Sequence, residues 1–457
     1  MQKLIGIWKN SAIEEKLLYI YTASIPFLDN YIFSFYGKKI VYADFIFVCM
    51  FLVWLINKIY TKSGLDFAGL KLPMFMLVGA FAVSFFNSVN ILNSLVELAG
   101  LVYLLVLFLL IIGIIKSPEK VKFVLCVYFF TAFVISFVGL FLIFLAFIGR
   151  NLSTTQFYGY STVEAMAHHF PRLDMGFESA NMLLAYLHVG FIAGAVIFLS
   201  MQSKRLRLII LLAIFVILSA AFFTGSRRFT GLLLSVFVII CWYGRGRLAA
   251  ISKYAVFSLF IVFLILAFLT TVWVVFPLMI SIDQPAKNIS VGANYAYSIH
   301  YLLPVVSVEI FKKHPLIGVG FGTWNKNFRD YVDWKWLKSS FGFKPYPNYV
   351  KLVDEKTLNF DPHSLFFGVL AETGILGLAV LIYFLTAYAR KLIRSFRASS
   401  YLSFENILLG CILAGFIGFM FNALTLDILS MRHFWFMLAV GMVGIRLCNP
   451  ENISENK

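Results

Sequence analysis

The stretch with the clearest capacity for chemistry is DPHSLFFGVLAETGILG, which runs from Asp361 to Gly377. It sets an ionisable side chain, His363, at the beginning of a long apolar run. Asp361 is a favourable helix N-cap and Pro362 fits the first helical position, so we expect His363 in the first turn of a helix. A neutral imidazole there can serve as a general base, and the helix N-terminus favours a nearby phosphate. The alternative is that Asp-Pro-His forms only a polar helix cap.

Arginines at three other places in the sequence could bind such an anion. Arg172 lies in HHFPRLDMGFESAN, Arg227 and Arg228 lie in the short turn FTGSRRFTG, and Arg432 opens the last apolar run. The guanidinium fork suits bidentate binding of phosphate oxygens. An arginine at a membrane surface can instead contact lipid headgroups, and for Arg432 both interpretations stay open.

The composition is that of a membrane protein. Hydrophobic residues make up 61% of the chain, charged residues 13%, and the mean hydropathy is +0.88, whereas soluble domains are about 45–50% apolar. A membrane span needs about 20 apolar residues, and such runs predict an all-α polytopic membrane protein with about twelve transmembrane helices. The twelve runs lie at 17–35, 41–58, 73–90, 96–115, 121–149, 180–201, 206–223, 229–243, 254–280, 363–388, 404–423 and 430–447.

The net charge of +16 follows the membrane topology and does not indicate a nucleic-acid surface. With a cytoplasmic N-terminus, the even-numbered connections between the runs are rich in Lys and Arg and poor in acids, which is the positive-inside pattern. Their basic residues are Lys58, Lys62, Lys71, Lys116, Lys120, Lys122, Lys204, Arg205, Arg207, Arg245, Arg247, Lys253, Arg390, Lys391, Arg394 and Arg397. We therefore expect Arg172, Arg227, Arg228 and His363 to meet at the opposite, outer face.

One connection is far longer than the others. Residues 281–362 form an outer loop of a length that is usually functional or separately folded. The chain thus divides into 1–280, with helices one to nine, the outer loop 281–362, and 363–457, with helices ten to twelve and a cytoplasmic tail. The loop has no cysteine and no set of His, Asp and Glu at ligand spacing, so we expect neither disulfides nor a metal site. Glu372 lies out of phase with His363 and about 14 Å deeper, so we expect it to pair with another helix.

Four motifs together resemble the O-antigen ligase and polymerase family of lipid-linked glycan transferases. His363 and Ser364, followed after nine residues by Gly374 and then by Gly377, resemble the family's signature. HPLIGVGFGTW, which contains Gly318 and Gly320, resembles its Pro-x-x-Gly-x-Gly-x-Gly segment. TGSRR resembles its small-Gly-Ser-Arg turn, and RLDMGFESAN resembles its Arg-x-x-Gly-x-Phe-x-x-x-Asn segment. The motifs lie in this family's order and on one predicted face.

The resemblance implies a GT-C-like enzyme of the bacterial inner membrane whose active site faces the periplasm. The donor would be a glycan on undecaprenyl pyrophosphate, the acceptor lipid A-core or another glycan, and neither a cofactor nor a metal would be needed. His363 would take the proton of the acceptor hydroxyl as it attacks the anomeric carbon with inversion. Arg172 and Arg227 would hold the pyrophosphate, with Arg228 and His300 as helpers. His300 stands where the family commonly has an arginine, which leaves one phosphate contact in doubt.

The acceptor stays open at this point. A ligase transfers the glycan to lipid A-core, a polymerase extends another lipid-linked glycan, and a related oligosaccharyltransferase modifies protein. The spacing after His363 favours the ligase, and Leu183 stands where the Arg-x10-Gly pattern of many polymerases would place a glycine after Arg172. Outside the enzymes, the alternative is a transporter of lipid-linked glycans, which predicts ionisable residues near the midplane and two matched halves. The sequence has no evident internal repeat.

Overall fold

The computed structural model of the chain describes residues 2–27, 31–35, 38–147, 173–244, 303–331 and 362–448. Within these residues, seven helices are long and apolar enough to cross a membrane. They are α3 (Tyr42–Thr61), α5 (Ile91–Ile114), α6 (Pro118–Phe147), α7 (Ala180–Ser200), α8 (Lys204–Phe223), α15 (Leu365–Ala398) and α16 (Phe404–Ala423). The predicted class, an all-α polytopic membrane protein, is confirmed. The expected span 254–280 lies outside the described residues.

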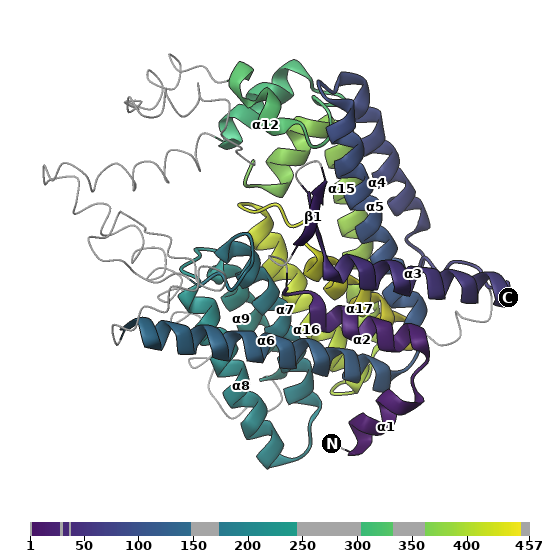
Figure 1. Ribbon diagram of the computed structural model, residues 1–457, viewed down its shortest axis with the longest axis vertical. Coiled ribbons are helices and arrows are strands. Elements are labelled where there is room, and N and C mark those ends of the chain that lie inside the picture. The colour runs from purple at the N-terminus through teal and green to yellow at the C-terminus, as the bar shows by residue number, and fades with distance from the viewer. Residues whose placement is uncertain are drawn as a thin grey trace, which may run out of the picture.

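Three further apolar helices are shorter. They are α4 (Lys71–Val83), which continues as the 3-10 turn η1 (Ser84–Asn87), α9 (Phe229–Tyr243) and α17 (Arg432–Cys448). The outer loop contributes a helical stretch over residues 303–313, the short helix α12 (Trp324–Asn327) and the 3-10 turn η4 (Phe328–Tyr331). Figure 1 shows α12 beside the upper ends of α4, α5 and α15.

The beginning of the chain differs from the prediction. The expected helix over 17–35 is wrong, because α1 (Gln2–Asn10) and α2 (Ile13–Ser24) are followed by an antiparallel hairpin of β1 (Tyr31–Phe35) and β2 (Lys38–Val41). Pro26 closely follows the last helical residue, and a proline cannot continue a helix. The segment YIFSF that follows is aromatic and β-branched, which favours a strand. The helix prediction for residues 17–35 was wrong because it relied on apolar character alone.

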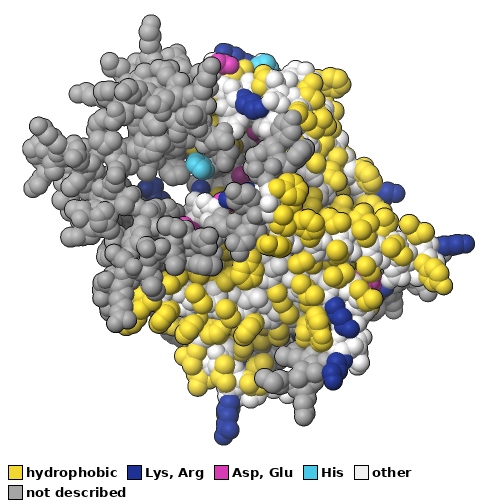
Figure 2. Space-filling view, in the orientation of Figure 1, with side chains coloured by type: hydrophobic (Ala, Val, Ile, Leu, Met, Phe, Trp, Pro, Cys, Tyr) yellow, Lys and Arg dark blue, Asp and Glu magenta, His cyan; other side chains and the backbone are white. Residues whose placement is uncertain are grey.

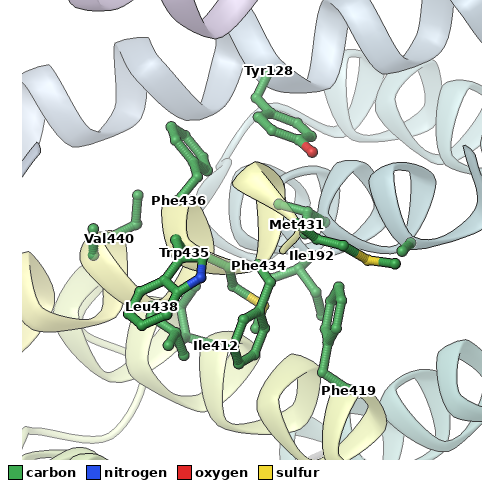
Figure 3. Close-up of a cluster of buried hydrophobic side chains, with 14 of the residues drawn as sticks. Tyr128, Ile192, Ile412, Phe419, Met431, Phe434, Trp435, Phe436, Leu438 and Val440 are labelled. Carbon is green, nitrogen blue, oxygen red and sulfur yellow. The ribbon is translucent and has the colours of Figure 1, made fainter. Parts of the chain in front are cut away.

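The core of the bundle surrounds α17. From His433 to Gly444 this helix is buried on all sides, as expected of a helix that is apolar all round. The Phe436 ring stacks on Tyr128 of α6 with centroids 5.0 Å apart, and Phe434 packs against Phe419 of α16 at 5.4 Å. Figure 3 shows these rings on opposite sides of α17. Helices α6 and α16 therefore pack against α17, which forms the centre of the bundle.

The outer helices of the bundle offer an apolar surface to lipid. In the most apolar window of α7, 83% of the residues are buried, whereas the figure is 22% for α3 and for α8. Figure 2 shows hydrophobic side chains spread over the face formed by α2, α3 and α6, with Lys and Arg at its margins. Exposed apolar surface of this extent is expected where a protein meets a membrane.

The ends of the helices form two groups of contacts. At one end, Arg446 pairs with Asp66 and donates to the carbonyls of Ile112 and Ile115, all in or beside connections predicted to be cytoplasmic. At the other end lie the starts of α7, α9, α15 and α17, where the candidate functional residues are found. The grouping agrees with the predicted topology, although the side of the membrane itself stays a prediction.

Candidate active site

His363 immediately precedes the N-cap of α15. The helix begins at Leu365, and Ser364 is its N-cap, with the Ser364 Oγ accepting from the Phe367 N–H at 3.4 Å. The expected cap at Asp361 and the expected place of His363 in the first turn are therefore wrong by three residues. Asp361 itself lies outside the described residues. His363 has a φ of +46°, a left-handed conformation that is uncommon for a residue with a side chain. The half-buried imidazole stays at the positive end of the helix dipole.

Nine residues into α15, the helix breaks at Gly374. This glycine has φ 65° and ψ −165°, a conformation essentially restricted to glycine. A continuous helix would bond Ile375 N–H to the Ala371 carbonyl and Leu376 N–H to the Glu372 carbonyl. The break frees two donors and two acceptors, which need other partners because an unpaired main-chain group within a membrane span costs several kcal/mol.

A segment of the outer loop, residues 314–324, supplies those partners. We call it the glycine segment because it carries Gly318, Gly320 and Gly322. Four main-chain hydrogen bonds replace the two that the helix loses. They run from Val319 N to Ala371 O (3.2 Å), Gly320 N to Glu372 O (2.9 Å), Ile375 N to Pro315 O (2.9 Å) and Leu376 N to Leu316 O (3.2 Å). The glycine segment and the broken helix thus complete each other's hydrogen bonding.

The spacing of the glycines follows from this close approach. A Cβ on Gly318 would lie 2.3 Å from the Glu372 carbonyl carbon, and one on Gly374 would lie 2.4 Å from the Leu316 carbonyl. Gly320 and Gly322 also have positive φ angles and face Ser88 and Glu97. Gly377 leaves room for the Thr373 side chain one turn earlier. Gly318 and Gly374 are therefore required where main chain packs against main chain, and the other three glycines make room for neighbouring residues.

Glu372 joins the same arrangement through its side chain. Its Oε1 accepts from the Trp324 N–H at 3.0 Å, at the first residue of α12. The carboxyl is buried, and it holds the outer loop to α15. The sequence predicted that Glu372 pairs with another helix. Its partner is the main chain of the single-turn helix α12.

The turn between α4 and α5 holds the glycine segment from its other side. Asn87 Nδ2 donates to the Gly318 carbonyl at 2.9 Å, Asn93 Nδ2 donates to the Gly322 carbonyl, and Ser84 Oγ accepts from the Phe321 N–H at 2.9 Å. Sequence reasoning missed these residues. The polar residues of SFFNSVNILNS, set between two apolar runs, were the available signal.

The arginine turn is fastened to the start of α7. Ser226 Oγ donates to Asn181 Oδ1 at 2.7 Å and accepts from the Arg228 N–H at 3.3 Å. Leu173 N donates to the Phe223 carbonyl at 3.1 Å, which fixes the residue after Arg172 at the end of α8. Arg172 and His300 lie outside the described residues. The segments that resemble the Arg-x-x-Gly and Gly-Ser-Arg motifs are nevertheless neighbours.

The two arginines of this turn differ in surroundings. Arg228 is only 7% exposed, and its Nη2 donates to the Thr425 carbonyl in the connection between α16 and α17. Arg227 is half-buried, and burial lowers the pKa of its guanidinium from the ordinary value. Arginine nevertheless keeps its charge in proteins. Arg227 is therefore the better placed of the two to meet a ligand, and Arg228 holds the turn to its neighbour.

The connection between α16 and α17 links the arginine turn to the helix that follows His363. Thr425 accepts from Arg228, and the next carbonyl, that of Leu426, accepts from the Leu365 N–H at 3.2 Å. Sequence reasoning did not single out this connection, because backbone carbonyls leave no signal in residue type. All four motifs are thus joined by hydrogen bonds at one end of the bundle.

Arg432 has a different environment. Its Nη2 pairs with Asp44 at the start of α3 at 2.9 Å, and its guanidinium lies 5.4 Å from the centroid of the Tyr103 ring. Of the two interpretations left open by the sequence, neither describes this contact. Arg432 joins α17 to α3 and α5 as an ion pair between helices.

Within the described residues, no group of three or more His, Cys, Asp or Glu side chains could hold a metal ion. No disulfide joins the cysteines of the described residues. The expectation that the reaction needs no metal stays a prediction.

The fold and the joined motifs define a multi-pass membrane protein with a polar site at one end of its helices. A family model described as O-Antigen ligase matches residues 212–382. This confirms the predicted resemblance to the O-antigen ligase family, and it covers the arginine turn, the glycine segment and the first half of α15. The match supports a glycosyltransferase of the ligase and polymerase type that acts on lipid-linked glycans. Comparison with curated proteins gives no match.

Proposed function

We propose that the protein transfers a glycan from undecaprenyl pyrophosphate to lipid A-core at the periplasmic face of the bacterial inner membrane. The observation that carries the proposal is the pair of neighbouring carbonyls at Thr425 and Leu426, which bind Arg228 and the start of the helix behind His363. A cationic turn and a candidate base on adjoining elements are what transfer from a pyrophosphate donor requires.

The chemistry follows from these groups. The acceptor hydroxyl oxygen forms a bond to the anomeric carbon, and its proton passes to the His363 imidazole. The bond between the anomeric carbon and the pyrophosphate oxygen breaks, and the electron pair leaves with undecaprenyl pyrophosphate. Arg227 and Arg172, with Arg228 and His300 as helpers, bind the charge that develops on this leaving group. His363 then loses the proton to solvent. Such a leaving group needs neither protonation nor a metal.

Related enzymes that use the same kind of donor differ in the acceptor. A polymerase would use the same donor as its own acceptor, and an oligosaccharyltransferase would use a protein hydroxyl. The spacing of His363, Ser364, Gly374 and Gly377 favours the ligase. A transporter of lipid-linked glycans is not favoured, because the candidate ionisable groups gather at one end of the helices.

The test is an incubation of the purified protein with an undecaprenyl-pyrophosphate glycan, with and without lipid A-core, followed by separation of the products on a gel. We expect glycan on lipid A-core and no product from donor alone. A ladder of longer lipid-linked chains from donor alone would replace the ligase by the polymerase. Export of unmodified donor by proteoliposomes, with no transfer to any acceptor, would support the transporter.

A further inference from the structure

The break in α15 makes the position of His363 depend on contacts far from it. Residues 365–373 form a separate half-helix of about 14 Å, with His363 before one end and the break at Gly374 behind the other. Nothing in a glycine prevents a helical conformation. Without the glycine segment, α15 could close its two missing hydrogen bonds and become one continuous helix, which would swing the end near His363 away.

Of the side chains that bond to the glycine segment, two come from different elements and test its position separately. Asn87 donates to the Gly318 carbonyl at 2.9 Å, and Glu372 accepts from the Trp324 N–H at 3.0 Å. One side chain comes from the turn between α4 and α5, and the other from the half-helix itself. The Asn87 bond lies within the part of the segment that enters the break, residues 315–320, and the Glu372 bond lies just beyond it.

We infer that Asn87 and Glu372 are positioning residues, which fix the direction of the half-helix and so place His363 relative to the arginine turn. The inference rests on the function proposed above. His363 lies at the far end of the half-helix from the break, so a small change in the direction of the half-helix moves its imidazole. A misplacement of about 1 Å can cost about a hundredfold in rate. Donor binding, which depends on the arginine turn, should change much less than turnover.

The substitutions that test this are chosen by hydrogen-bonding capacity. Asn87→Asp keeps the size of the side chain but replaces the donor by a second acceptor facing the Gly318 carbonyl. Asn87 is exposed, so the new charge need not be buried. Glu372→Ala removes the acceptor for Trp324, whereas Glu372→Gln keeps one acceptor oxygen. Glu309→Ala is the matched control, because Glu309 lies in the same outer loop and its ion pair within the described residues is with Lys312 at the surface.

Two measurements on the full-length protein in detergent separate the steps of the inference. Amide hydrogen exchange of residues 314–324 reports whether the segment stays in the break, and steady-state transfer gives kcat and the donor KM. For Asn87→Asp and Glu372→Ala we expect exchange and kcat to change by about tenfold or more, with the donor KM within about threefold. Glu372→Gln and Glu309→Ala should resemble the wild-type protein.

The outcomes distinguish the inference from the function on which it rests. Faster exchange with unchanged kcat in Asn87→Asp would overturn the inference and leave the proposed function intact. Unchanged exchange in both variants would overturn it as well. Should Glu372→Ala not fold, Asn87→Asp alone decides. Absence of transfer by the wild-type protein overturns the proposed function and the inference with it.

Discussion

Arg228 and Leu365 bind consecutive carbonyls of one connection, those of Thr425 and Leu426. The two donors are more than a hundred residues apart in the sequence, and each belongs to a different motif. Because one peptide unit separates their acceptors, the arginine turn cannot move away from the start of α15 without breaking a hydrogen bond made by a buried donor, Arg228 or Leu365. The anion site and the base proposed here are thus held in register by main chain.

The first prediction concerns Arg227. Arg227→Lys keeps the charge but loses the planar fork, so we expect donor binding to weaken by about tenfold, measured with labelled donor on the purified protein. Arg228→Lys is the comparison. Because Arg228 is buried and bonded to Thr425, its replacement should lower the midpoint of thermal unfolding more than Arg227→Lys does. Equal donor binding by wild type and Arg227→Lys would reduce Arg227 to a lipid contact.

The second prediction concerns His363 as the base. Asparagine tolerates the left-handed conformation that this position requires, so His363→Asn should fold normally. It has no group that can take a proton at neutral pH, and we expect turnover to fall by about 10² to 10⁴. Binding of labelled donor should be retained. A fully active His363→Asn protein would remove the proposed mechanism for ligase and polymerase alike.

The parts of the site that sequence could predict are those that depend on residue type. His363, Arg227 and Arg228 were singled out because each type is unusual at its place in a membrane chain, and the glycine motifs because they resemble those of the family. The helix start was misplaced, since Asp361, Pro362 and Ser364 all favour a helix N-terminus and local propensity cannot choose among them. The structure chooses Ser364, whose carbonyl already accepts from the Gly368 N–H.

The parts that sequence could not predict depend on main-chain contacts across long distances. Gly374 is visible as a glycine, but the break it allows becomes favourable only when the glycine segment supplies partners for Ala371 and Glu372. The role of the connection at Thr425 and Leu426 rests on carbonyl oxygens, which every residue has. The hairpin at 31–41 replaced an expected helix because its aromatic residues suit both a span and a strand.

The third prediction tests the ion pair between Asp44 and Arg432. The two side chains are 16% and 19% exposed, so the loss of either partner should cost about 1–3 kcal/mol, between surface and fully buried pairs. Unfolding of Asp44→Asn, Arg432→Gln and the double variant should show a coupling, with the double variant more stable than additivity predicts. Additive effects would show that the two side chains do not stabilise each other. A loss of donor binding specific to Arg432→Gln would assign Arg432 to the ligand instead.

The fourth prediction is that transfer needs no divalent metal. Guanidinium groups at Arg227 and Arg172 would supply the positive charge that a metal brings to a pyrophosphate leaving group. Transfer by the purified protein should therefore proceed at the same rate after treatment with a chelator. A loss of activity that Mg²⁺ or Mn²⁺ restores would contradict the mechanism, even with the arginines in place.

The fifth prediction concerns the break in α15. Gly374→Ala would put a side chain into a conformation that only glycine adopts readily, and its Cβ would meet the Leu316 main chain at 2.4 Å. The conformational strain alone is of order 1–3 kcal/mol, so the midpoint of thermal unfolding should fall, or the glycine segment should leave the break. Gly100→Ala in α5 is the control, because nothing lies within 4 Å of its Cβ position and alanine is the better helix former by about 1 kcal/mol. If Gly374→Ala unfolds at the same temperature as the wild-type protein, and residues 314–324 exchange no faster in it, the glycine at 374 is not what holds the helix open.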